Sequence, residues 1–330
     1  MKIIDHSAIL SLGISPLDAY HWVENVIQEK ETAILPPKIS MRQAGNVFYN
    51  VMPCILQSED RMGVKIITRH PEKTQGPSLT SQILLYELSS GQLIAVLDGS
   101  YITAMRTGAV AAYSAQLFGV QNFTTVGIMG LGITATATMD ILSVVNQERS
   151  MEIHLLRYKG QERQFMKRYE STEKLRFVLH DSTESLIRSS QVILSCVTCA
   201  EKNFAEANMY QPGCTVIPVH TMGFQNCDLE FDKIFTDDIG HIKDFQYFDQ
   251  FKSLAEVSEV IHGNVPGRTS KQERILVYNI GIAIHDVYFA NQIWKQKPNA
   301  MEVSLEGPLQ KMWFPRPGTN PSDESICKLL

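Results

Sequence analysis

The sequence predicts an α/β protein of two domains, in which a mixed sheet precedes a doubly wound parallel sheet. The chain has 330 residues, more than one modest core accommodates. Up to residue 99, apolar runs rich in β-branched residues are separated by short polar turns, as in antiparallel or mixed sheets. From Phe123 onward, strand-like and helix-like segments alternate, which is typical of a parallel sheet covered by helices on both faces.

The first region begins with an amphipathic helix, predicted over residues 15–31. Four strands follow, and a polar segment at residues 89–92 joins the last two as a hairpin turn. An alanine-rich helix then ends at Gly119, because glycine commonly terminates helices. The predicted strands span residues 47–53, 63–70, 81–88 and 93–99, and the alanine-rich helix spans 101–119.

The second region contains six predicted strands and a closing helix near residues 274–296. We therefore expect one domain to comprise residues 1–115 together with 298–330, and the other to comprise 116–297. The irregular last 30 residues either pack back on the first domain or extend away from it. The six strands are predicted at residues 124–129, 152–157, 176–180, 191–196, 214–219 and 233–238.

A glycine-rich turn directly follows the first of these six strands. It has the pattern GxGxxA and runs into a helix-forming segment. Gly130 permits a sharp turn, Gly132 lets the backbone approach a phosphate, and Ala135 keeps helix and strand close. The helix N-terminus adds free N–H groups and partial positive charge for an anion. The pattern therefore predicts a Rossmann-type dinucleotide site, with binding residues Gly130, Leu131, Gly132, Ile133, Thr134 and Ala135.

Composition and charge exclude several other classes of protein. A net charge of −5 and a pI near 6.0 provide no general affinity for nucleic acid or anionic membranes. No apolar segment approaches the roughly 18 residues that a membrane span requires. Asp5 and His6 interrupt the apolar N-terminus, which does not resemble a signal peptide. We therefore predict a cytoplasmic protein without nucleic-acid or membrane partners.

Cysteines and histidines give no metal-binding pattern. Among six cysteines, only Cys196 and Cys199 form a CxxC pair, at the end of an apolar strand and without a second pair at zinc spacing. Buried thiols are the favoured interpretation over a redox or metal role. The nine histidines are scattered and form neither HxxxH nor HExxH, so we predict no metal site.

Several segments together resemble the ornithine cyclodeaminase/mu-crystallin family. They are VMP (51–53), GVKII (63–67), LIAVLDGSYITAMRTGAVAA (93–112), GIMGLGITA (127–135) and HGNVPGRTS with NIGIAIHDV (262–287). The resemblance implies a homodimer in which an α+β domain binds substrate and forms the subunit interface. It also implies that the Rossmann domain presents NAD(H) or NADP(H) to that pocket. Members of this family interconvert α-amino acids and imines by hydride transfer at the α-carbon.

Arg106 and Lys65 are the predicted catalytic and substrate-binding residues. Arg106 lies among small residues in ITAMRTGAV and could form a surface contact or structural salt bridge. The resemblance implies that it binds the substrate α-carboxylate, for which a planar guanidinium is well suited. Lys65 lies in an apolar strand, where alternation alone would place it in solvent. The resemblance places it in the pocket, where burial would lower its pKa and allow proton transfer.

Two further parts of the predicted substrate site remain open. Either Lys38 or Arg42 matches a basic residue that the family has before the VMP strand, although both could be solvated loop cations. Cyclodeaminases of the family carry an acid at the position of Phe224, which binds the side-chain amine. A phenyl ring cannot replace that carboxylate except by a cation–π contact, and the nearest acid is Asp228. Ring closure of ornithine is therefore disfavoured.

The end of the second Rossmann strand indicates the choice of cofactor. Its residues Arg157, Tyr158 and Lys159 include no carboxylate to bind the ribose hydroxyls of NAD. Two cations would instead attract the 2′-phosphate of NADP, unless both are simply solvated. We therefore expect NADP(H) in preference to NAD(H). Thr198 and His220 follow later strands and are further candidate cofactor contacts, although His220 could equally be a core histidine.

The sequence thus predicts an NAD(P)-dependent oxidoreductase acting on a small amino acid or imino acid. It would be an amino-acid dehydrogenase, a ketimine reductase or an opine-type enzyme. One alternative is an ornithine cyclodeaminase that converts L-ornithine to L-proline and ammonia. A second is a non-catalytic protein that binds NADPH or another small ligand.

Overall fold

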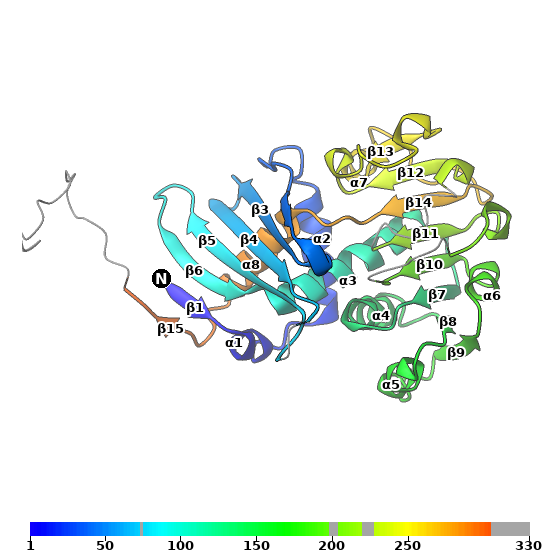
Figure 1. Cartoon of the computed structure of the whole chain (residues 1–330), viewed down its shortest axis with the longest axis horizontal. Helices are drawn as coiled ribbons and strands as arrows, with labels where there is room; N and C mark the ends of the chain where they lie inside the picture. Colours follow the sequence, from blue (N-terminus) through cyan, green and yellow to red (C-terminus); the bar gives the residue numbers. More distant parts are fainter. Residues whose placement is uncertain (73–74, 198–203, 220–227, 305–330) are drawn as a thin grey trace, which may run out of the picture.

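Two sheets lie side by side in the computed structural model, which describes residues 1–72, 75–197, 204–219 and 228–304 (Figure 1). One sheet has seven strands in the order β15-β1-β6-β5-β4-β3-β2. The other has eight strands in the order β13-β12-β14-β11-β10-β7-β8-β9, and every pairing within it is parallel. The predicted fold class, a Rossmann-type doubly wound sheet with an additional α+β domain, is confirmed.

Antiparallel pairing dominates the seven-stranded sheet. Strands β2 to β6 form a meander, while β1 pairs in parallel with β6 and antiparallel with β15. The four strands expected from sequence correspond to β3–β6, whereas the short strands β1, β2 and β15 were not predicted. The bounds are β1 (Lys2–Ile4), β2 (Ile39–Arg42), β3 (Phe48–Leu56), β4 (Arg61–Arg69), β5 (Leu79–Glu87), β6 (Leu93–Asp98) and β15 (Met301–Glu302).

Three long helices cover one face of this sheet. α3 and α8 contact its strands, and α2 packs over both helices (Figure 1). Ser15 caps the N-terminus of α2 with a reciprocal capping box, which explains where that helix begins. The helices of this part are α1 (His6–Leu10), α2 (Pro16–Ile27), α3 (Gly99–Phe118) and α8 (Ala283–Lys295), with a 3-10 turn at Ala44–Asn46.

The parallel sheet alternates with helices, as the sequence predicts. All six expected strands are present, while the three-residue strand β13 and the strand β14 were not expected. Its elements are β7 (Thr125–Met129), α4 (Ile133–Val145), β8 (Met151–Leu156), α5 (Gln161–Arg168), β9 (Leu175–His180), α6 (Thr183–Arg188), β10 (Val192–Ser195), β11 (Thr215–Pro218), β12 (Lys233–Thr236), β13 (Leu254–Glu256), α7 (Val257–Ile261) and β14 (Ile275–Tyr278). Further 3-10 turns lie at Ala207–Met209, Asp228–Glu230, Ile239–His241 and Phe248–Gln250.

The single helix expected near residues 274–296 is wrong in its first part. Ile275–Tyr278 form β14, a fully buried strand between β11 and β12. The chain then turns at Gly281, whose φ of +87° is a left-handed conformation that favours glycine, and the helix begins only at Ala283. The domain division at residue 297 stays a prediction. The contacts of α8 with β3, β4 and β5 favour an earlier return to the first domain, near residue 282.

Close packing between α3 and α4 joins the two parts of the molecule. A Cβ on Gly108 of α3 would lie 2.7 Å from the Cβ of Ala137 in α4, so only glycine permits this approach. Arg106 lies two residues before Gly108 on the same helix. The contact therefore brings the helix that carries Arg106 against the helix that follows the glycine-rich turn.

Candidate active site

The centre of the candidate site is a buried cluster of two cations and one carboxylate. Lys65 of β4 donates from Nζ to Oδ1 of Asp286 at 2.7 Å, and Arg106 of α3 donates from Nε to the same oxygen at 3.0 Å. Lys65 and Asp286 have no exposed surface, and Arg106 is 6% exposed. The structure thus brings together two predicted residues that are 41 positions apart, and adds Asp286 from α8.

Lys65 lies inside the protein because α8 covers its face of the sheet. Gly63 faces the same way two residues earlier, and a Cβ there would lie 2.6 Å from a methyl group of Val287. This close approach allows the lysine to reach Asp286. Burial lowers the pKa of Lys65 to about 8, and Arg106 acts in the same direction, although Asp286 partly opposes both. The expected solvent-facing alternative for Lys65 is therefore wrong.

Asp286 lies in the first turn of α8, where the helix N-terminus favours a negative charge. Burial alone would raise the pKa of this carboxyl group, but Arg106 and Lys65 outweigh burial and hold the pKa below its usual value. Sequence analysis missed Asp286. The available signal was an aspartate in the apolar segment NIGIAIHDV, because an acid within a buried helix requires a cationic partner.

Arg106 retains two nitrogen atoms for a ligand. Its Nε is occupied by Asp286, whereas Nη1 and Nη2 have no hydrogen-bond partner within the described parts of the chain. The guanidinium lies directly over Gly281, where a Cβ would be 2.8 Å from Nη1 and 3.2 Å from Nη2. An unpaired guanidinium edge in a largely buried position is well suited to bind a carboxylate through two parallel hydrogen bonds.

Of the two alternatives for a third cation, only Lys38 lies near this cluster. Lys38 is partly buried, and burial lowers its pKa, while the charge of Arg106 acts in the same direction and that of Asp237 opposes it. Arg42 is exposed on the edge strand β2. Lys38 is therefore a third basic residue in the neighbourhood of the Lys65–Asp286–Arg106 cluster.

The glycine-rich turn has the geometry that a pyrophosphate requires. Gly130 has a φ of +79°, and a Cβ there would lie 2.7 Å from the carbonyl carbon of Cys196 at the end of β10. Among the residues that the structure describes, no atom lies within 4 Å of a Cβ on Gly132 and no side chain caps the N-terminus of α4. The described residues therefore leave the N-terminus of α4 uncapped and the space beside Gly132 open, which fits a dinucleotide pyrophosphate.

At the end of β8, one of the two cations expected to bind a phosphate is already paired with a carboxylate. Arg157 pairs from Nε with Oδ1 of Asp181 at 3.0 Å, and the two side chains are 50% and 85% exposed. The ammonium group of Lys159 lies 5.1 Å from the centre of the Tyr158 ring. Both cations are accessible to a ligand, but Asp181, which sequence analysis did not consider, would compete with a phosphate for Arg157.

Several predicted residues cannot be placed. Thr198, His220 and Phe224 lie outside the described residues, as does Cys199. Asp228 is fully buried and accepts a hydrogen bond of 2.6 Å from the hydroxyl of Tyr278, and burial raises its pKa to about 6.

The described part of the chain contains no cluster of three or more metal-ligating side chains and no helix long and apolar enough to cross a membrane. Burial raises the pKa of the Cys196 thiol to about 12.

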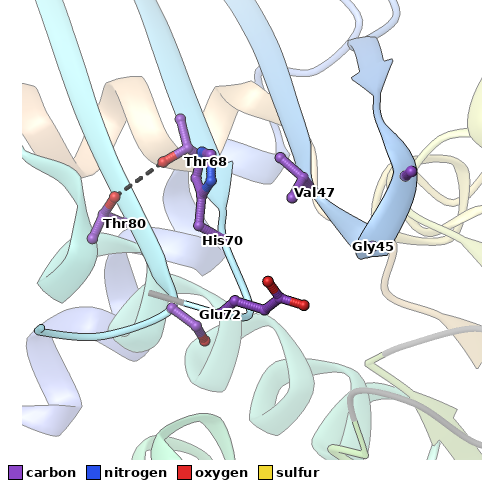
Figure 2. A pocket seen from close by; sticks show the side chains of 8 residues that line it. Gly45, Val47, Thr68, His70, Glu72 and Thr80 are labelled. Carbon is purple, nitrogen blue, oxygen red and sulfur yellow. Dashed lines mark hydrogen bonds between the residues drawn. The ribbon is translucent and has the colours of Figure 1, made fainter. Parts of the chain in front are cut away.

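An open pocket of about 460 Å³ lies away from this cluster, at the ends of β4 and β5 (Figure 2). Thr68 and Thr80 share a hydrogen bond of 3.0 Å beside it, and His70 bonds to the hydroxyl of Tyr49 at 2.8 Å. Thr68 is three residues after Lys65 and therefore points to the opposite face of the strand. The pocket and the buried cluster thus lie on opposite faces of the sheet.

Comparison with known proteins shows to which family the chain belongs. The sequence profile of the ornithine cyclodeaminase/mu-crystallin family matches residues 17–300. The chain belongs to this family. The resemblance noted in the sequence is thereby confirmed, and the family includes NAD(P)-dependent reductases and dehydrogenases of imino and amino acids.

Relatives from several organisms match most of the chain. The nodulation efficiency protein NfeD of Rhizobium meliloti is 27% identical, with 78% of this chain and 83% of the relative covered. A Δ1-pyrroline-2-carboxylate reductase of Bacillus cereus is 23% identical over 74% of this chain and 80% of its own. The ketimine reductase mu-crystallin of Mus musculus is 23% identical, with 89% and 94% covered.

Solved structures show the same fold. The Δ1-pyrroline-2-carboxylate reductase of Thermococcus litoralis, in complex with NADH and L-proline, has a TM-score of 0.79 at 20% identity. It covers 92% of this chain and all of its own. An archaeal alanine dehydrogenase dimer with bound NAD has a TM-score of 0.79 at 21% identity, with 92% and 99% covered. At these identities the likeness establishes the fold alone.

Proposed function

We propose that this protein is an NAD(P)-dependent reductase that converts a small α-imino acid to the corresponding α-amino acid. The observation that carries the proposal is the buried Lys65–Asp286–Arg106 cluster, in which Nη1 and Nη2 of Arg106 have no partner among the described residues. Such a cluster fits a substrate that has a carboxylate next to a nitrogen atom which must gain or lose a proton. The reverse reaction would oxidise the amino acid.

Arg106 binds the substrate carboxylate. Asp286 fixes the guanidinium at Nε and Gly281 supports its face, so that the free edge has one orientation. Two parallel hydrogen bonds then set the direction of the α-carbon, and this fixed orientation supplies much of the rate enhancement. Lys38 would add a second positive charge, since it lies close enough to lower the pKa of Lys65.

Lys65 transfers the proton at the substrate nitrogen. With a pKa of about 8, its ammonium form is populated at neutral pH and yet gives up its proton readily. Asp286 stabilises the ammonium form between turnovers. Because Lys65 has no exposed surface, its proton is shielded from bulk water until a substrate enters beside Arg106.

Gly130–Ala135 would hold the pyrophosphate of the cofactor, and a bound nicotinamide supplies the hydride. We further propose that NADP(H) is preferred over NAD(H), supported by Arg157 and Lys159 at the end of β8 and by the absence of a carboxylate among residues 157–159. The preference is expected to be modest, because Asp181 already pairs with Arg157.

A small cyclic imino acid is the proposed substrate, rather than ornithine. Phe224 stands where family cyclodeaminases have an acid, and a curated relative is named as a Δ1-pyrroline-2-carboxylate reductase. The test uses purified protein with Δ1-pyrroline-2-carboxylate or Δ1-piperideine-2-carboxylate as substrate. Oxidation of NADPH or NADH is measured by the loss of absorbance, and we expect turnover of at least one of these imines. Conversion of L-ornithine to proline and ammonia at a comparable rate would contradict the substrate assignment. Cofactor binding without turnover of any imine would support a non-catalytic binding protein instead.

We propose a cytoplasmic homodimer that associates through the seven-stranded sheet. The sheet face opposite α3 and α8, which no helix of the described residues covers, carries half-exposed apolar side chains on neighbouring strands, among them Pro53, Ile55, Val64, Ile66 and Leu84. A continuous apolar sheet face of this kind is typical of a protein interface. Light scattering after gel filtration tests the dimer, and Val64→Glu should yield monomers. A wild-type monomer at micromolar concentration would contradict the proposal.

A further inference from the structure

Asp237 is a buried carboxylate that the proposed mechanism does not use. It directly follows β12 of the parallel sheet and is only 2% exposed. Its backbone N–H donates to the carbonyl oxygen of Tyr278 at 3.2 Å, which ties it to the end of the neighbouring strand β14. A carboxylate at this depth is costly unless its oxygens accept hydrogen bonds, so its partners indicate its role.

The principal partner of Asp237 is the turn that leads from β14 to α8. Its Oδ2 accepts a hydrogen bond of 2.6 Å from the backbone N–H of Gly281. Gly281 is the residue over which the guanidinium of Arg106 lies, with only 2.8 Å between Nη1 and the position of a Cβ. Five residues later, Asp286 binds Nε of the same arginine. The turn that Asp237 binds therefore packs against the guanidinium of Arg106 through Gly281. The same turn leads into α8, from which Asp286 binds Nε of Arg106.

Asp237 also lies beside the loop that carries Lys38. The backbone N–H of Lys38 donates to Nε2 of His241 at 3.4 Å, and His241 follows Asp237 by four residues. Burial raises the pKa of the Asp237 carboxyl, and the positive charge of Lys38 partly opposes that effect. Oδ1 of Asp237 has no hydrogen-bond partner within the described residues. The Asp237 carboxylate thus accepts a hydrogen bond from Gly281, which contacts Arg106, and also interacts electrostatically with Lys38.

We infer that Asp237 is a positioning residue for the substrate carboxylate, acting through Gly281 to hold Arg106 in its binding orientation. Asp237 directly follows a strand of the parallel sheet, whereas Arg106 lies on α3, which packs on the seven-stranded sheet. The link therefore sets where the carboxylate is held relative to the cofactor domain. This inference rests on the proposed function, because it assumes that Arg106 binds the substrate.

Steady-state kinetics of Asp237→Ala and Asp237→Asn, with Δ1-pyrroline-2-carboxylate and NADPH, test the inference. The alanine variant leaves the Gly281 N–H without its acceptor, and we expect the KM for the imino acid to rise roughly tenfold or more. The KM for NADPH should change less than about twofold. The asparagine variant keeps an oxygen acceptor and should recover most of the affinity. A rise that is equal for the two substrates would contradict the inference.

Asp232→Ala is the matched control. Asp232 precedes the same strand β12, and its carboxylate accepts a hydrogen bond of 2.8 Å from the backbone N–H of Arg274, which precedes β14. Asp232→Ala therefore removes a backbone-to-carboxylate hydrogen bond at the opposite end of the same two strands, in an exposed position rather than a buried one. We expect no change in the KM for the imino acid. If Asp237→Ala and Asp232→Ala have the same KM values, Asp237 has only a structural role.

A crystal structure of Asp237→Ala separates failure of this inference from failure of the proposed function. Even if no imino acid is turned over, displacement of Gly281 and of the Arg106 guanidinium would support the positioning role. An unchanged Arg106 would overturn it. Should Asp237→Ala fail to fold, Asp237→Asn provides the same structural comparison, and an Arg106 that moves although the Gly281 bond is retained would also contradict the inference.

Discussion

The buried cluster around Asp286 and the exposed end of β8 use similar side chains in opposite environments. Lys65 and Arg106 are almost fully enclosed and share one carboxylate, whereas Arg157 and its partner Asp181 are 50% and 85% exposed. Charges interact strongly where water is excluded, and weakly where solvent and salt screen them. Burial therefore makes the contacts of Lys65 and Arg106 with Asp286 stronger than the pair of Arg157 with Asp181.

The largest effect is expected from Asp286→Ala. This change leaves Lys65 and Arg106 buried without their carboxylate, and removing one partner of a buried ion pair costs about 3–5 kcal/mol. The free energy of unfolding should fall by that amount in urea titrations. Glu148→Ala, which removes the partner of Lys174 in an exposed pair, should leave it nearly unchanged. Similar losses of unfolding free energy in both variants would contradict the claim that the buried ion pair contributes more to stability than the exposed one.

Arg106→Lys should be the next largest change, and it concerns substrate rather than stability. Lysine cannot reproduce the two parallel hydrogen bonds, so kcat/KM for the imino acid should fall by about a hundredfold or more. The dissociation constant for NADPH, measured by fluorescence, should remain unchanged. Arg61→Lys is the control, because Arg61 is also buried but bonds to Asn291. An equal loss of kcat/KM in this control would argue against a specific role of Arg106.

The titration of Lys65 predicts a pH dependence of intermediate size. Because burial lowers its pKa to about 8, the ammonium form that donates a proton is lost as the pH rises through that value. The rate of imine reduction should therefore decline tenfold per pH unit above about pH 8, whereas oxidation of the amino acid should increase through the same range. Lys65→Met should abolish this limb of the profile. A reduction rate that stays constant from about pH 7 to about pH 9.5 would contradict the assignment.

The smallest effect is expected at the exposed end of β8. Asp181→Asn frees Arg157 for a 2′-phosphate, so the ratio of kcat/KM for NADPH to that for NADH should increase about two- to fivefold. Arg157→Ala should lower the same ratio. Glu170→Gln, at an exposed position of the same domain, should not alter it. A hundredfold change in this ratio would show that the exposed pair dominates cofactor choice, which would contradict the weak interaction expected of an exposed pair.

Local signals in the sequence were sufficient for most of the fold and for part of the site. The glycine-rich turn was predictable because Gly130 and Gly132 are adjacent to the strand and helix that define it. The strand β14 was not separated from α8, because the apolar run ILVY has no period that distinguishes a buried strand from a helix. Gly281, which lies in the turn between β14 and α8, becomes informative only when its positive φ is known.

Contacts between distant segments could not be predicted. Lys65 and Asp286 are separated by 221 residues, and only the packing of α8 on β4 brings them together. Alternation alone placed Lys65 in solvent, because it cannot indicate which sheet face a later helix will cover. Asp237 and Asp181 were missed for the same reason, since their partners Gly281 and Arg157 lie in other elements.

The most direct test of the account is the binding of a planar carboxylate to the protein saturated with NADPH. Isothermal titration with pyrrole-2-carboxylate and with the uncharged pyrrole-2-carboxamide compares two ligands that differ in the group that Arg106 should bind. We predict that only the acid binds, and that Arg106→Lys weakens it at least about tenfold. Equal binding of acid and amide, or unchanged affinity in Arg106→Lys, would contradict the claim that this arginine holds the substrate carboxylate.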